Sequence, residues 1–122
     1  MATSLKQRGI RKVSPIVTVA AAATEEVLYQ VTTLTTVPRT AYVRKIHAYN
    51  NVAATTLMLG TGPLGAWVQQ LPTFQLINLM DNIWMEDEII GYEFFTDIFV
   101  QTDVLGVLVQ IEVEEILTSS EV

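Results

Sequence analysis

The sequence predicts an all-β protein, a single antiparallel β-sandwich of jelly-roll type with about eight strands. Thr, Val, Ile and aromatic residues recur in short runs that Gly, Pro and Asn interrupt, which is the spacing typical of a sandwich or barrel. Half of the 122 residues are hydrophobic and 16% are charged, which argues against disorder. This length suits one domain with a buried core.

Short β-rich runs divide the chain into elements that turn residues separate. Strands are expected at 14–20, 27–34, 41–49, 54–60, 66–70, 73–78, 83–88, 93–102 and 105–116. The good helix formers of 20–30 are followed at once by β-branched residues, so we expect a turn that leads into a strand there. The predicted organisation is a basic N-terminal arm (1–12), the sandwich domain (13–117) and a C-terminal tail (118–122).

The last two strands have the clearest alternation. Val107, Val109, Ile111 and Val113 share one parity, and so do Tyr92, Phe94, Ile98 and Val100 in the strand before. Both sets are expected to face the core, because successive side chains of a strand point to opposite faces. The segment "TDVLG" (102–106) is expected to join these strands as an antiparallel hairpin, with Gly106 at positive φ.

Charge is distributed unevenly over a chain whose net charge is −6. Four of the seven Lys and Arg residues lie in the first twelve positions, whereas residues 46–122 carry eleven acids and no Lys or Arg. A body of this sign repels phosphate backbones, so no nucleic-acid partner is expected. No apolar run is long enough to span a membrane. The absence of cysteine excludes disulfides and thiolate metal sites.

Two motifs that suggest chemistry lack the required context. The segment "GTGPLG" (60–65) matches the dinucleotide-binding pattern, but a strand-like "AWVQQLP" follows it where that motif needs a helix. We therefore expect a turn between two strands. His47 is the only histidine, and no serine has the surroundings of a nucleophile, so His47 is expected to be a surface or interface residue. No catalytic residue and no cofactor is predicted.

The acidic segment 81–88 permits three interpretations. Glu86 and Glu88 have the spacing of a glycosidase pair on one strand face. The hard oxygen ligands of Asp81, Asn82, Glu86, Asp87 and Glu88 could bind calcium, although their order differs from that of an EF-hand loop. The third interpretation, which we adopt, is a solvated strand edge whose charges prevent unwanted pairing. No metal site is therefore predicted.

One stretch resembles a known family. The segment "LYQVTTLTTVPRTAYVRKIHAYNNVAATTLMLGTG" (28–62) is similar to small β-sandwich virion proteins of tailed bacteriophages, of the head decoration or cement type. The likeness lies in Val37-Pro38, Ala41, Val43, Ile46, Asn50-Asn51 and Thr55-Thr56-Leu57. Arg39-Thr40 departs from the pattern, which has a glycine-containing turn there. The resemblance implies a capsid decoration protein at the capsid surface of a virion, or else a tail or neck accessory protein.

The expected contacts follow from that resemblance and from the charge pattern. The resemblance implies binding to the major capsid protein or another virion protein, and a homo-oligomer, with a trimer favoured. The basic arm and exposed apolar side chains are expected to bridge subunits. The residues assigned to this interface are Lys6, Arg8, Arg11, Lys12, Phe95, Phe99 and Leu108. The alternative is a lectin-like carbohydrate-binding module that uses Trp67, Trp84 or Tyr92 for stacking and calcium at the acidic segment.

Overall fold

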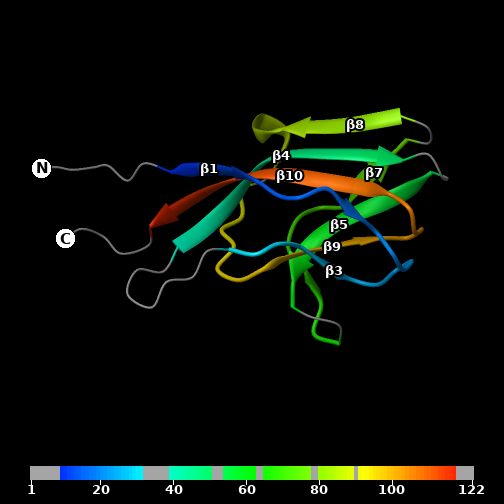
Figure 1. Ribbon diagram of the computed structural model, residues 1–122, viewed down its shortest axis with the longest axis horizontal. Coiled ribbons are helices and arrows are strands. Elements are labelled where there is room, and N and C mark those ends of the chain that lie inside the picture. The colour runs from blue at the N-terminus through cyan, green and yellow to red at the C-terminus, as the bar shows by residue number, and fades with distance from the viewer. Residues whose placement is uncertain are drawn as a thin grey trace, which may run out of the picture.

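The predicted all-β sandwich is confirmed by the computed structural model, which describes residues 9–31, 39–50, 54–62, 65–77, 80–89 and 91–117. In these ranges ten strands form two antiparallel sheets (Figure 1). Sheet A contains β1 (Ile10–Val13), β2 (Val17–Thr18), β4 (Arg39–Asn50), β8 (Met80–Met85) and β10 (Leu108–Leu117). Sheet B contains β3 (Glu26–Tyr29), β5 (Thr55–Thr61), β6 (Val68–Gln69), β7 (Phe74–Leu76) and β9 (Ile98–Thr102). A 3₁₀ turn, η2 (Glu86–Glu88), follows β8.

The strand order is that of a jelly roll. In sheet A, β1 and β2 lie end to end along β10, and the order continues through β4 to β8. In sheet B, β6 and β7 lie end to end along β5, and the order continues through β9 to β3. Each end-to-end pair occupies one strand position, so the ten strands fill eight positions, four in each sheet. This agrees with the prediction of about eight strands.

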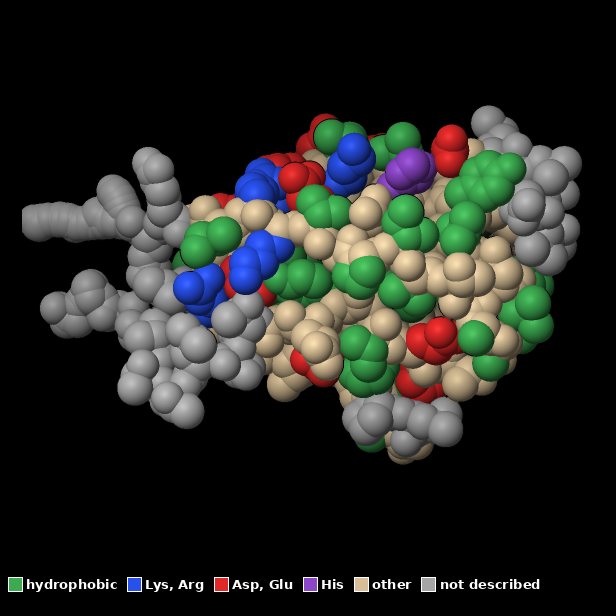
Figure 2. Space-filling view, in the orientation of Figure 1, with side chains coloured by type: hydrophobic (Ala, Val, Ile, Leu, Met, Phe, Trp, Pro, Cys, Tyr) green, Lys and Arg blue, Asp and Glu red, His purple; other side chains and the backbone are tan. Residues whose placement is uncertain are grey.

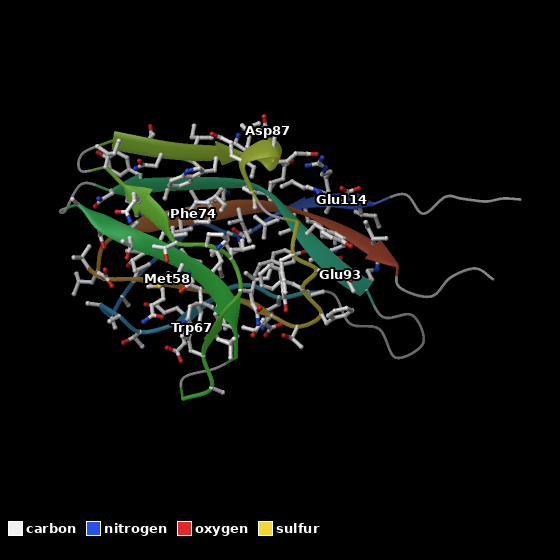
Figure 3. The ribbon with its side chains drawn as sticks, turned by 180° about the vertical axis from the view of Figure 1, so that it is seen from behind. Met58, Trp67, Phe74, Asp87, Glu93 and Glu114 are labelled. Atoms are coloured by element: carbon white, nitrogen blue, oxygen red, sulfur yellow. The ribbon has the colours of Figure 1, made fainter. Side chains whose placement is uncertain are left out.

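The core forms where the alternation predicts it. Of the residues predicted to face inward, Val107, Val109, Ile111 and Val113 are buried, and so are Phe94, Ile98 and Val100. Tyr92 is partly buried and packs against this core. Phe74 of sheet B (Figure 3) and Trp84 of sheet A meet between the sheets, with ring centroids 4.8 Å apart. The sandwich is therefore closed by side chains of both sheets.

The predicted hairpin at 102–106 is wrong, because β9 lies in sheet B and β10 in sheet A. Other segments supply the partners: the Thr102 carbonyl accepts a hydrogen bond from Ala23 N at 2.7 Å, and Val107 O accepts one from Val19 N at 2.9 Å. Gly106 has the expected positive φ, 93°. The glycine at positive φ therefore lies in a connection that crosses between the sheets and not in a hairpin.

Two strand predictions are corrected in the segment before β9. The strand expected at 83–88 ends at Met85, and η2 begins at Glu86. The Glu88 carboxylate accepts a hydrogen bond from Met85 N at 2.9 Å. The strand expected at 93–102 is interrupted: Phe94 forms an isolated bridge with Ala41 of sheet A, and β9 begins only at Ile98. The chain crosses from one sheet to the other in between.

The N-terminal strand β1 was not predicted, and the expected boundary between arm and domain at residue 12 falls inside it. Its four residues pair with β10, from Ile10 opposite Glu115 to Val13 opposite Glu112. The sequence "IRKV" lacks the alternation of a half-buried strand. The strand begins at the end of the sandwich where β10 finishes (Figure 1).

The glycines of "GTGPLG" have a backbone role. Gly62 and Gly65 both have φ of 91°, a conformation that L side chains rarely adopt. They lie between β5 and β6, which pair antiparallel. The predicted turn between two strands is confirmed. Among the described residues, no helix is long and apolar enough to cross a membrane.

Two adjacent phenylalanines test the assignment of the core. Phe94 has no exposed surface, whereas the side chain of Phe95 is 59% exposed. Phe94→Ala should lower the free energy of unfolding by about 3–5 kcal/mol, because it leaves a large cavity. Phe95→Ala should change it by only about 0.5 kcal/mol. Urea denaturation of both variants measures the difference, and equal losses would contradict this core.

Candidate functional site

The outward surface of sheet A, which we call the sheet A face, combines apolar margins with a polar centre. One row across the strands runs Val13, Glu112, Lys45, Met85, and the next runs Gln110, His47, Ile83. A third row contains Leu108, Tyr49 and Asp81. Val13, Ile16, Tyr49, Ile83 and Met85 are each at least 37% exposed. In the first two rows apolar side chains thus lie beside a polar strip of Glu112, Lys45, Gln110 and His47, and in the third row Leu108 and Tyr49 extend the apolar surface.

The polar strip is hollowed. One hollow of about 210 Å³ is lined by residues that include Val13 and Lys45, and a second of about 150 Å³ by residues that include Ile16 and Tyr49. The two hollows share His47 and Gln110. Figure 2 shows hydrophobic side chains around the single histidine on this side of the molecule. The surface therefore has depressions into which apolar side chains of a partner can fit.

Three ion pairs link ionisable groups of the sheet A face within the chain. His47 Nε2 lies 3.1 Å from the Asp81 carboxylate, and Arg11 lies 3.2 Å from Glu86 and 3.9 Å from Glu112. These pairs are largely exposed, so each contributes about 0–1 kcal/mol to stability. These pairs fix the positions of the polar side chains on the face and add little to the stability of the fold.

A second cluster, the Glu115 cluster, lies at the end of the sandwich where β1 begins. The Glu115 side chain has no exposed surface. Its carboxylate accepts a hydrogen bond from the Tyr29 hydroxyl at 2.5 Å and lies 3.4 Å from Lys12 Nζ and 3.5 Å from an Arg39 terminal nitrogen. The four residues belong to β10, β3, β1 and β4. One buried carboxylate therefore connects both sheets.

The Tyr29 phenol acts as a hydrogen-bond donor in this cluster. Burial raises the pKa of Tyr29 above its usual value, and the hydrogen bond to Glu115 and the charge of that carboxylate add to the rise. The nearby Arg39 lowers this pKa and offsets part of it. The phenol therefore keeps its proton at neutral pH and can donate it to the carboxylate.

Glu115 was not among the residues that the sequence indicated, although its parity places it inside. It continues the series of Ile111 and Val113, which are buried on β10. Glu112 and Glu114 lie on the opposite, half-exposed side of the strand. A carboxylate gives no hydrophobic signal, so the alternation of the strand is the only pattern that could have found it.

The basic residues predicted to bind neighbours divide into two pairs. Lys6 and Arg8 lie outside the described residues. Arg11 and Lys12 belong to β1 and pair with acids of the same chain. The two described cations of the predicted arm therefore hold β1 against its own sandwich.

The apolar residues predicted for the interface do not form one surface. Phe99 faces outward from sheet B, whereas Leu108 faces outward from sheet A. Because β9 and β10 belong to different sheets, these two side chains cannot share a patch. Phe95 is exposed on the segment that crosses between the sheets. Leu108 instead lines the second hollow of the sheet A face.

The aromatic residues of the lectin alternative are dispersed. Trp84 packs against Phe74 in the interior, and Tyr92 packs edge-on against Phe94 with ring centroids 4.8 Å apart. Trp67 lies over Gly60 of sheet B, where an added Cβ would come 2.9 Å from its ring. Trp84 is therefore not available for stacking on a sugar.

Four of the five residues of the calcium alternative have other partners, among them Glu88, which accepts a hydrogen bond from Met85 N. Asn82 is buried and accepts a hydrogen bond from Ile77 N at 3.1 Å. Asp81 faces His47, Glu86 faces Arg11, and Asp87 points away from the sandwich (Figure 3). Within the described ranges, no group of three or more His, Cys, Asp or Glu residues is placed to hold a metal ion.

Replacing Tyr29 tests the Glu115 cluster. Tyr29→Phe should lower the free energy of unfolding by about 1.5–3 kcal/mol at pH 7, because the buried carboxylate loses a hydrogen bond. A raised pKa in the folded state stabilises the protein below the unfolded pKa of about 10, and this contribution is lost as pH rises further. Above about pH 10, the free energy of unfolding should therefore fall less steeply with pH for Tyr29→Phe than for the wild-type protein.

Chemical denaturation at pH 7 and between about pH 9 and 11, on either side of the unfolded pKa, measures both effects. Tyr49→Phe is the matched control, because Tyr49 is exposed on the sheet A face. If Tyr29→Phe behaved like Tyr49→Phe at pH 7, the hydrogen bond to Glu115 would not contribute to stability.

No protein-family model and no curated protein sequence matches the chain. A solved structure described as "Bacillus endospore appendages form a novel family of disulfide-linked pili" is similar, with a TM-score of 0.52 and 9% sequence identity. The similarity covers 98% of this chain and 96% of that chain. At this identity the likeness shows the fold alone, a β-rich architecture that extends over nearly the whole of both chains.

Proposed function

We propose that this protein is a non-enzymatic structural subunit that assembles with copies of itself through the sheet A face. The observation that carries the proposal is the set of exposed apolar side chains in register across the strands of sheet A, around hollows of about 210 and 150 Å³. Exposed apolar patches of this kind usually mark contact surfaces. Association would bury Ile83, Met85, Val13 and Ile16 and fill the hollows.

The polar groups of the sheet A face favour binding over catalysis. His47 and Asp81 form an acid–base pair, but a hydrolase of the serine type also needs a nucleophile beside the histidine. Ser14 is buried, and its hydroxyl accepts a hydrogen bond from Ile111 N at 3.0 Å. Among the described residues, no other serine is present. The pair is better suited to hydrogen bonding across an interface.

The structural similarity supports an assembly role, since the similar protein is described as forming pili. That description also specifies disulfide links, whereas this chain contains no cysteine. An assembly of this protein must therefore be held by contacts other than disulfides. Burial of apolar surface, at roughly 25 cal/mol per Å², is the main source of such affinity.

The location suggested by the sequence, on a virion capsid or in a tail or neck, is part of the proposal. A subunit that associates laterally could cover a capsid lattice as a trimer or form part of a tail or neck, and the attachment to a major capsid protein stays a prediction. Self-association is the property that each of these locations shares. It is also the property that purified protein can test directly.

A charge placed in the sheet A face should weaken association. Ile83 lies beside His47 on this face and is 49% exposed, so Ile83→Asp should fold normally. It should lower the association constant at least tenfold, because the new carboxylate would be desolvated on binding. Sedimentation velocity over a range of concentrations measures the change.

The control is Val68→Asp, which adds the same charge at a similarly exposed position of sheet B. Phe95→Ser tests the contact predicted from the sequence. A protein that stays monomeric at high concentration would contradict the proposal. Weakening by Phe95→Ser but not by Ile83→Asp would contradict the choice of the sheet A face.

A further inference from the structure

We propose that strand β1 is exchanged between copies of this chain, so that β1 of one subunit pairs with β10 of another in the position that its own β1 occupies here. The inference deepens the proposed assembly and rests on it. It names a second contact, made by backbone pairing and ion pairs, in addition to the apolar sheet A face.

The first argument is that β1 is weakly held. None of its four side chains is buried, and Ile10 and Val13 are 45% and 59% exposed. The strand is attached by backbone pairing with residues 112–115 and by the ion pairs of Arg11 and Lys12. The pairs of Arg11 are exposed, so they contribute little and are weakened by salt. The Lys12 side chain is itself 39% exposed, and it is one of three partners of the buried Glu115 carboxylate, which also contacts Tyr29 and Arg39. Segments with little apolar burial are the first to open locally.

The second argument is that a firm pivot follows this weak strand. Ser14 is buried and donates a backbone hydrogen bond to Ile111 O at 2.9 Å. Its hydroxyl accepts from Ile111 N at 3.0 Å, and its carbonyl accepts from the Gln110 side chain at 3.0 Å. Pro15 comes next and has no backbone N–H to continue the ladder. The chain can therefore open before Ser14 while Ser14 stays in place.

The third argument is that the acceptor edge persists when β1 leaves. β10 is paired along its whole length with β4, from Leu108 opposite Tyr49 to Leu117 opposite Arg39. Glu115 keeps its contacts with Tyr29 and Arg39 after β1 departs. The freed edge would present unpaired backbone groups, which are a template for another strand. Exchange restores the same contacts between subunits, so its cost is low.

Cysteine pairs can detect this exchange, because the native chain has no cysteine. Val13 and Glu112 face each other across β1 and β10. Val13→Cys protein and Glu112→Cys protein, carrying tags of different mass, are mixed under the conditions of assembly and oxidised. Directly opposite positions of an antiparallel pair have a separation that a disulfide can bridge.

The expected result is a mixed disulfide at least tenfold more abundant than that between Val13→Cys and Ile83→Cys, a control position that is exposed on the same sheet A face but does not lie opposite Val13. The double variant Val13→Cys/Glu112→Cys, oxidised as a monomer, should hold β1 in its own subunit and prevent exchange. Equal yields for the two mixtures would overturn the proposal.

Charge variants test the ionic contribution. Lys12→Gln should speed the appearance of mixed disulfide about fivefold, because it removes the pair with Glu115. Arg44→Gln makes the same charge change on β4, at a residue that pairs with Glu114 of its own chain and lines neither hollow, and should leave the rate unaltered; if both variants exchanged equally, the role of Lys12 would be overturned. If the wild-type protein formed oligomers but the mixture of Val13→Cys and Glu112→Cys proteins gave no excess of mixed disulfide, strand exchange would be overturned and the assembly proposal would stand. A strictly monomeric protein would instead overturn the assembly proposal.

Discussion

A carboxylate buried between two sheets has to be compensated, and the compensation of Glu115 constrains the end of the sandwich at which β1 begins. Transferring such a charge from water costs several kcal/mol unless cations and donors surround it. Tyr29 reaches the carboxylate from sheet B, Arg39 from the start of β4, and Lys12 from β1. Strands β1, β3 and β4 must therefore each place one residue beside Glu115 of β10. If one partner is removed, the other two still contact the Glu115 carboxylate. If the carboxylate is removed, the largely buried Arg39 side chain loses this counter-charge.

Most of the fold could be predicted because the core residues alternate. Val107, Val109 and Val113 face inward as their parity requires. The connection at 102–106 could not be predicted from its local chemistry, since Gly106 suits a hairpin and a crossing between sheets equally well. Which of the two forms depends on partners far away in the chain, such as Val19, and no local pattern contains that information.

The candidate site was less predictable than the fold. Exposed apolar positions such as Ile83 and Tyr49 look like ordinary strand residues in the sequence, and only the pairing of β4, β8 and β10 brings them onto one face. Strand β1 gave no signal because its side chains are not buried. The charges of Arg11 and Lys12 were visible from the start, but their partners inside the chain were not.

Two kinds of contact serve different purposes in an assembly without disulfides. An apolar face supplies affinity, but burial of apolar surface is not directional and does not fix how two subunits are aligned. Backbone pairing fixes register, because a slip of one residue would turn every side chain of the strand to the other face. In β1, such a slip would move Lys12 away from Glu115. The Glu115 cluster would therefore select the correct register whether β1 comes from its own subunit or from a neighbour.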